Sequence, residues 1–240
     1  MTTTVIVAAL DRELKPLVES WEQTEIKFQG KTFRVFEKQT HGRQDGEQKN
    51  LVAVAGGIGS RAAKLAARAM VATYRPTVLM SAGLAGAVHS SLKIGCIVTP
   101  DAVIDAKGKN KYHCTLGSSL TAEGVLVSAD EIADEKVKQQ LGNDFQALAV
   151  DMEATAVAEV AKDAGIGFGC VKAISDEASF PMLPLNQFVS SEGEFQTNRF
   201  AAWVSLRPWT WAQVIALGRN SNHATQALCD WLKEYAGQIG

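Results

Sequence analysis

The chain has 240 residues, of which 46% are hydrophobic and 21% are charged, enough to bury a sizeable core in one large or two small globular domains. Its 24 Lys and Arg against 26 Asp and Glu give a formal net charge of −2, so it lacks the basic excess of a dedicated nucleic-acid-binding protein. No apolar run approaches the roughly 20 residues that span a bilayer, and the start lacks the features of a signal peptide; we therefore expect no transmembrane segment and a soluble, cytoplasmic protein.

Apolar runs rich in β-branched residues predict four buried parallel strands, at residues 5–10, 51–55, 77–81 and 167–174. Helical patterns follow the first three runs, at 11–21, at 60–74 and, less clearly, after Gly86. This alternation predicts an α/β fold. Shorter strands that extend the same sheet are expected at 33–36, 96–104 and 124–127, with polar turns between them such as 41–49.

The second half of the chain predicts a helix and then a long loop. Residues 151–164 have helical spacing, with Asp151 and Glu153 in the first turn, where the helix dipole favours acids, and Gly165 at the end. Residues 180–208 contain three prolines and scattered aromatics, and lead to an amphipathic C-terminal helix within 211–235. With no linker in view, we expect one domain over residues 1–240.

The four cysteines predict neither a metal site nor disulfides. Cys96, Cys114, Cys170 and Cys229 lie far apart and form no Cys-x-x-Cys pair, which argues against zinc. A chain of this length and apolar content has a core that replaces the disulfides of small secreted domains. We expect four reduced thiols.

Carboxylates and glycine-rich turns follow the predicted strands, where an open α/β sheet binds its ligand. The four segments are 11–13, 56–59, 81–86 and 175–177. Residues 57–62 match the dinucleotide pattern G-x-G-x-x-A, but the acidic residue that should follow about 20 positions later is missing. These glycines therefore either form a tight turn or let a ligand approach the backbone.

The acidic residues taken singly also allow structural interpretations. Asp176 follows a buried run, where burial could raise its pKa, yet Ser175 and Asp176 could equally cap a following helix. Glu153 could serve only to stabilise the helix dipole. Glu13 could be an exposed residue of the first helix. Residue type alone leaves both interpretations open.

Five motifs together resemble the nucleoside phosphorylase and nucleosidase superfamily, most closely its methylthioadenosine/S-adenosylhomocysteine nucleosidase branch. They occupy residues 5–13, 57–59, 81–86, 150–154 and 171–176, with Met-Glu-Ala and Ser-Asp as the most specific parts. The resemblance implies a three-layer α/β sandwich around a mixed, mostly parallel central sheet. It also implies a small-molecule purine nucleoside as substrate and an enzyme that needs no cofactor. We expect a homo-oligomer, with a dimer as the first candidate.

The resemblance also implies roles for individual residues. Asp176 would protonate the purine N7 as the glycosidic bond breaks, and Ser175 would orient it. Glu153 would accept hydrogen bonds from the ribose hydroxyls while Met152 packs against the sugar, and Glu13 would hold and deprotonate the attacking water. This assignment suits the chemistry, because an oxocarbenium-like sugar and a departing base require one acid and one ionised carboxylate.

Other substrate contacts are expected from the turns and from one loop. The implied contacts are Gly57, Ala85 and Gly86, and the segment 128–132, with Ile132, would receive the purine.

Two departures from the family pattern affect the reaction and the substrate. Phosphorolytic members have an arginine where this chain has Ser81 and a serine where it has Leu84, which favours hydrolysis by water. Phosphorolysis stays open, because Arg12 or Arg61 could rebuild an anion site. A domain that binds nucleosides without turnover is the third alternative.

The aromatic tail after residue 180 is the second departure. It resembles phosphorylase-like proteins associated with hopanoid synthesis, which are thought to remove adenine from adenosylhopane. An apolar extension could receive a bulky 5′ substituent. The same aromatics could instead pack the last helix onto the core or form a subunit interface.

Overall fold

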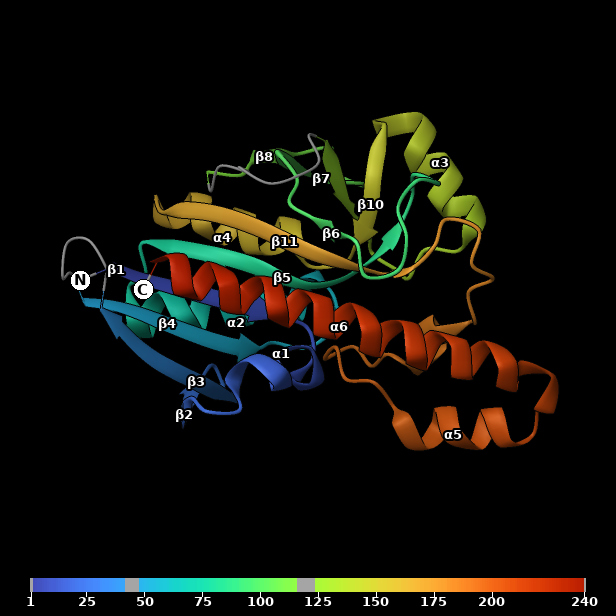
Figure 1. Cartoon of the computed structure of the whole chain (residues 1–240), viewed down its shortest axis with the longest axis horizontal. Coiled ribbons are helices and arrows are strands. Elements are labelled where there is room, and N and C mark those ends of the chain that lie inside the picture. Colours follow the sequence, from blue (N-terminus) through green and yellow to red (C-terminus); the bar gives the residue numbers. More distant parts are fainter. Residues whose placement is uncertain (1, 42–47, 116–123, 240) are drawn as a thin grey trace.

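A mixed eleven-stranded sheet forms the centre of the protein (Figure 1). The computed structural model describes residues 2–41, 48–115 and 124–239. The strands are β1 (Thr2–Ala8), β2 (Glu22–Phe28), β3 (Lys31–His41), β4 (Gln48–Ala55), β5 (Val78–Ala87), β6 (Ile97–Val98), β7 (Ala102–Asp105), β8 (Lys111–His113), β9 (Val125–Ser128), β10 (Ala147–Asp151) and β11 (Gly167–Asp176). The main path runs β2-β3-β4-β1-β5-β10-β9-β7-β8, and β11 joins it through β5 and also pairs with β6.

The central strands run parallel and bring distant segments of the chain to one edge. Strand β1 pairs in parallel with β4 and β5, and β11 runs parallel to β5 from Gly167 opposite Val78 to Asp176 opposite Gly86. Strand β10 pairs antiparallel with the end of β5, where Val150 lies opposite Gly86. The ends of β5, β10 and β11 therefore meet.

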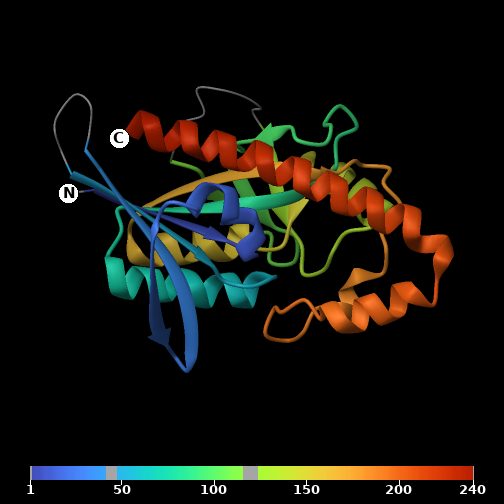
Figure 2. The same cartoon turned by 60° about the horizontal axis from the view of Figure 1, so that its bottom comes forward.

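Helices cover both faces of the sheet, which confirms the three-layer architecture (Figures 1 and 2). The helices are α1 (Asp11–Val18), α2 (Ser60–Tyr74), α3 (Glu135–Phe145), α4 (Ala154–Ala164), α5 (Thr197–Ser205) and α6 (Trp211–Ile239). Helices α2 and α4 pack together on one face, and α1 and α6 pack together on the other. Within the described residues, one apolar core contains Met70 and Val157, a second contains Leu14 and Leu228, and a smaller third contains Val127 and Leu141.

Several predicted elements were wrong at their boundaries. The helix predicted directly after Gly86 is absent, because β5 continues to Ala87 through pairing with β11 and, at Ala87, with β10. Asp151 ends β10, and α4 begins only at Ala154 with Glu153 as its N-cap residue. The strand predicted at 96–104 is interrupted around Pro100, which cannot donate to a ladder, and forms β6 and β7.

The predicted loop at 180–208 contains more structure than its composition indicated. Helix α5 and the short 3₁₀ segment Leu185–Phe188 lie within it, and a second 3₁₀ segment, Pro208–Thr210, begins at its last residue. Helix α3 and strands β2 and β10 were not predicted at all. Most of the turn predicted at 41–49 lies outside the described residues, since β3 reaches His41 and β4 begins at Gln48.

Three absences concern the described residues alone. No helix there is long and apolar enough to cross a membrane. No group of three or more His, Cys, Asp or Glu side chains there is placed to hold a metal ion. All four cysteines are free thiols.

Candidate active site

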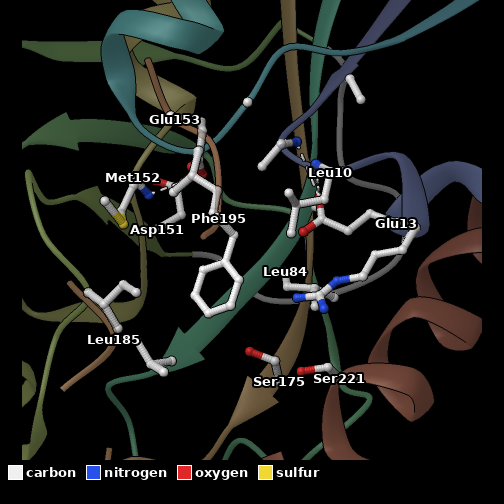
Figure 3. A pocket seen from close by; sticks show the side chains of 18 of the residues that line it. Leu10, Glu13, Leu84, Asp151, Met152, Glu153, Ser175, Leu185, Phe195 and Ser221 are labelled. Carbon is white, nitrogen blue, oxygen red and sulfur yellow. Dashed lines mark hydrogen bonds between the residues drawn. The ribbon is translucent and has the colours of Figure 1, made fainter. Parts of the chain in front are cut away.

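A cleft of about 860 Å³ opens at the ends of the central strands, and all nine predicted site residues line it (Figure 3). In the close-up, Glu13 and Glu153 approach the cleft from different walls, and Ser175 lies on a third side. The nine residues are Glu13, Gly57, Ala85, Gly86, Ile132, Met152, Glu153, Ser175 and Asp176. The tertiary structure therefore brings together residues that are more than 160 positions apart, as residue numbers 13 and 176 show.

Asp176 is the last residue of β11 and is buried between two partners. Ser175 Oγ donates to Asp176 Oδ1 at 2.8 Å. The Lys138 ammonium donates to Asp176 Oδ2 and, at 2.9 Å, to the carbonyl oxygen of Glu177. Strand β11 extends through both Ser175 and Asp176, so the helix-capping interpretation of these two residues is wrong.

Lys138 is a cleft residue that sequence reasoning missed. It lies on α3, whose N-cap residue Asp134 accepts a hydrogen bond from the backbone of Val137 at 2.9 Å. Lys138 is only 1% exposed and borders the cleft. Nothing distinguishes it in the sequence from Lys136 two positions earlier, because only the packing of α3 against the ends of β9 and β10 turns it inward.

A glycine is required at position 86 because Asp176 and Lys138 pack directly against its backbone. A Cβ atom added at Gly86 would lie 2.8 Å from Asp176 Oδ2 and 3.0 Å from Lys138 Cε. Both contacts are shorter than van der Waals packing allows. The glycine near the end of β5 therefore makes room for a buried carboxylate and ammonium beside the cleft.

Glu13 sits in the first turn of α1 with a carboxylate turned into the cleft. It is 4% exposed, and Oε2 accepts hydrogen bonds from the backbone nitrogens of Ala9 at 3.2 Å and Leu10 at 3.4 Å. Burial raises the pKa of Glu13, while the nearby charge of Lys172 opposes that shift. The interpretation of Glu13 as an exposed helix residue is therefore wrong.

A buried ion pair between Lys172 and Asp151 lies behind the two glutamates. Lys172 Nζ is 2.8 Å from Asp151 Oδ2, and Asp151 also accepts from Ser128 Oγ at 2.6 Å and from the Ala154 amide at 2.9 Å. Burial by itself lowers the pKa of Lys172, but the charge of Asp151 above all raises it beyond its ordinary value. Lys172 therefore supplies a fixed positive charge. Sequence analysis did not identify it as a site residue, because it lies within an apolar strand.

Glu153 closes the opposite wall of the cleft. Its Oε1 accepts from the Gly59 amide at 2.8 Å and its Oε2 accepts from the Met152 amide at 3.3 Å. Burial, followed by the charge of Asp151, raises the pKa of Glu153 to about 7. Its hydrogen bond to Gly59, at the start of α2, ties the glycine-rich turn to the acidic motif.

The backbone of Ile132 is occupied by a side chain from the tail. Its amide donates to Asn186 Oδ1 at 2.8 Å, and its carbonyl accepts from Asn186 Nδ2 at 3.4 Å. A purine that used both of these backbone groups would have to displace the Asn186 carboxamide. No sequence signal pointed to Asn186.

One end of the cleft is apolar and is built mainly by the tail. Its lining includes Met182, Leu185, Phe195, Phe200, Val214 and Leu217. Phe188, Phe195, Phe200 and Trp203 pack their rings against one another, with Phe188 and Phe200 centroids 5.3 Å apart. The predicted aromatic extension thus lies directly beside the carboxylates.

The residues considered for anion binding are not all at the cleft. Arg12 and Leu84 line it, whereas Arg61 and Ser81 are not among its lining residues. Ser81 is fully buried in β5, and its hydroxyl has no hydrogen-bond partner in the structure. Of the two arginines, Arg12 alone is placed to meet a ligand.

A three-layer α/β sandwich with a carboxylate-lined cleft at its strand ends is the arrangement of an α/β enzyme that acts on a small molecule. A family model described as the phosphorylase superfamily matches residues 3–117 and 111–200. A 5′-methylthioadenosine/S-adenosylhomocysteine nucleosidase of Actinobacillus succinogenes is 31% identical over 171 residues, which cover 59% of this chain and 72% of that protein. A nucleosidase of the same description from Shewanella halifaxensis is 26% identical over 206 residues, covering 72% and 86%. The chain belongs to the phosphorylase superfamily.

Solved structures show the same fold at lower identity. Futalosine hydrolase of Helicobacter pylori superposes with a TM-score of 0.71 at 17% identity, covering 99% of this chain and 98% of that one. The 5′-methylthioadenosine nucleosidase of Arabidopsis thaliana gives a TM-score of 0.73 at 18% identity, covering 100% and 96%. The architecture that the motifs implied is therefore confirmed.

Proposed function

We propose that this enzyme hydrolyses the N-glycosidic bond between adenine and a ribose that carries an apolar 5′ substituent. The observation that carries the proposal is the convergence of Glu13, Glu153 and the Asp176–Lys138 pair on one cleft. The nucleosidases among its relatives support the reaction class.

The Asp176–Lys138 pair is suited to the leaving group. When the bond between the anomeric carbon and N9 breaks, its electron pair moves onto the purine, and a proton placed on N7 neutralises it. In this proposal Asp176 in its protonated form delivers that proton, and the Lys138 ammonium beside it compensates the carboxylate that remains. Asp176 takes up a new proton from solvent before the next turnover. Ser175 holds the other carboxylate oxygen and so fixes the direction of transfer.

Glu13 is suited to activate the nucleophile. Water forms the new bond to the anomeric carbon and loses a proton to Glu13, so that free base and free ribose leave as neutral products. Its two backbone hydrogen bonds hold one carboxylate oxygen in place. Phosphorolysis is the second candidate and rests on Arg12, which lines the cleft together with Arg34.

Glu153 is expected to recognise the ribose hydroxyls. Glu153→Gln should lower the preference for a ribonucleoside over its 2′-deoxy analogue by about 10-fold, because a charged acceptor is replaced by a neutral amide. The measurement is kcat/KM for both substrates in each enzyme. Gln139→Glu, an exposed change on α3, is the control. If wild type and Glu153→Gln prefer the ribonucleoside equally, Glu153 does not recognise the ribose, and its role is limited to the hydrogen bond with Gly59.

The apolar end of the cleft supports a large 5′ substituent. Phe195, Phe200 and Leu217 line it within reach of the carboxylates, and burying apolar groups against them contributes roughly 25 cal/mol per Å². For the base, Ile132 offers a backbone donor and acceptor once Asn186 moves aside. An adenine edge presents the same acceptor and donor pair as the Asn186 carboxamide.

The decisive experiment measures base release from a panel of nucleosides with and without phosphate. The panel contains adenosine, inosine, methylthioadenosine, S-adenosylhomocysteine and a 5′-alkylthioadenosine with a long chain. We expect adenine release that rises with the apolar 5′ group and does not depend on phosphate. Preference for unsubstituted adenosine, or for inosine, would contradict the substrate assignment.

A further inference from the structure

Four large apolar side chains gather at the far end of the hairpin that α5 forms with the start of α6. Leu206 is 75% exposed, Trp209 74%, Trp211 50% and Ile215 61%. Among the described residues, Val137 on α3, 39% exposed, is the only other large apolar side chain in this class. We call Leu206, Trp209, Trp211 and Ile215 the apolar tip. Figures 1 and 2 show that this hairpin projects beyond the body of the protein.

The apolar tip is held in shape by contacts that leave its side chains uncovered. The Arg207 guanidinium lies 4.5 Å from the centre of the Trp203 ring and donates to the Trp203 carbonyl at 3.1 Å. Trp211 Nε1 donates to the Val204 carbonyl at 3.0 Å. Behind them, Phe200 and Trp203 stack within the aromatic cluster. The exposed tryptophans are thus part of an ordered turn.

The hairpin that carries the tip is positively charged. Residues 195–229 contain Arg199, Arg207 and Arg219 but no Asp or Glu, although the whole chain has a formal net charge of −2. Arg199 and Arg219 are exposed. The sequence therefore concentrates apolar and cationic side chains, and excludes acidic ones, on one projecting element.

We infer that the apolar tip docks this protein onto a lipid surface that carries anionic headgroups. Tryptophan suits such an interface because its ring is apolar while its N–H stays polar, and arginine at the same level meets phosphate. Docking is peripheral, because no described helix could cross a bilayer. A second copy bound tip to tip would instead bring two cationic hairpins together without an acidic counterpart.

The same helix connects the tip to the cleft. Val214, Leu217 and Gly218, at helical spacing, line the cleft from one face of α6, while Trp211 and Ile215 point elsewhere. Docking would therefore hold the apolar end of the cleft close to the lipid. If the proposed function is right, a nucleoside whose apolar 5′ group rests in the lipid could enter the cleft from the surface. Lipid binding itself requires no catalysis.

The test uses the full chain with vesicles of phosphatidylcholine, alone or mixed with phosphatidylglycerol. We expect cosedimentation with the mixed vesicles that weakens as salt increases. Trp209→Ser should weaken binding by about 10-fold or more, because a large apolar side chain no longer inserts. Arg219→Gln should weaken it about fivefold on the anionic vesicles alone. Val137→Ser, which removes an exposed apolar side chain elsewhere, should leave it unchanged.

Three outcomes would overturn the inference. One is no binding of the wild type to mixed vesicles, and another is equal weakening by Val137→Ser and Trp209→Ser. The third is a concentration-dependent dimer that Trp209→Ser dissociates in the absence of vesicle binding, which would assign the tip to a second copy. Thermal melting checks that each variant is folded. Adenine release from a water-soluble nucleoside is measured separately. A wild-type protein that releases adenine but does not bind mixed vesicles contradicts this inference and leaves the proposed function intact.

Discussion

Asp176→Asn is expected to lower base release by about 10² to 10⁴ while the protein stays folded. The amide has nearly the same shape, and its one oxygen can still accept from Lys138 while its NH2 group faces the Ser175 hydroxyl, but it cannot deliver a proton to the purine. The measurement is kcat with a saturating nucleoside, together with thermal melting. Asp105→Asn, a similar change on β7 that lies outside the cleft lining, is the control. Near wild-type turnover by a folded Asp176→Asn enzyme would remove Asp176 from the reaction.

Lys138 lets this experiment distinguish proton delivery from simple structural support. If Lys138 acts through Asp176, Lys138→Gln combined with Asp176→Asn should be no slower than Asp176→Asn alone, because the two residues then form one unit. If the two residues contributed independently, the rate losses of the two single variants would multiply in the double variant. Lys138→Gln alone leaves a buried carboxylate without its ammonium, so its melting temperature should also fall.

Glu13→Gln is expected to abolish most hydrolysis, again by about 10² to 10⁴, and to leave nucleoside binding intact. Contacts to base and sugar remain, while the group that removes a proton from water is lost. The measurements are kcat and the dissociation constant of an unreactive nucleoside analogue. Arg12→Gln is the matched variant at the neighbouring position and should be nearly neutral if water is the nucleophile. Ribose 1-phosphate as product, or a Glu13→Gln enzyme that works normally in phosphate buffer, would establish phosphorolysis instead.

The pH profile gives a second check on Glu13. A general base works only when ionised, and burial raises the pKa of Glu13 above its ordinary value. Turnover should therefore fall as pH decreases through that raised pKa, at a higher pH than for a solvent-exposed glutamate. Glu153 should impose a separate loss on kcat/KM near pH 7, where its own raised pKa lies. Residual Glu13→Gln activity that kept the same acid limb in kcat would assign that limb to another group.

Local patterns in the chain were enough to predict the main elements near the site. Helix α2 occupies the predicted range, because alanine-rich amphipathic spacing and a preceding glycine turn are local signals. Strand β11 starts where predicted and ends two residues later, at Asp176. The nine site residues came from a different source, the resemblance of five short motifs, and each of them lines the cleft. Their catalytic roles stay predictions.

The remaining features depend on contacts between segments distant in the sequence. Residues 82–87, mostly alanine and glycine, carry no strand signal, and pairing with β11 and, at the end, with β10 makes them part of β5. The sequence predicted Asp151 in the first turn of a helix. In the structure Asp151 ends β10, which pairs with β9, and it is buried in an ion pair with Lys172.

The sequence by itself determined the apolar strands β1, β4, β5 and β11 and the helices α1 and α2, and its family motifs indicated which acidic residues could do chemistry. Only the tertiary structure decided which cations neutralise those acids, since Lys138 and Lys172 reach their partners across 38 and 21 positions, from 138 to 176 and from 151 to 172. Only the tertiary structure placed Asn186 on Ile132 and the aromatic tail beside the cleft. The physical reason is that burial and ion pairing are set by packing between distant segments, whereas periodicity and turn chemistry are local.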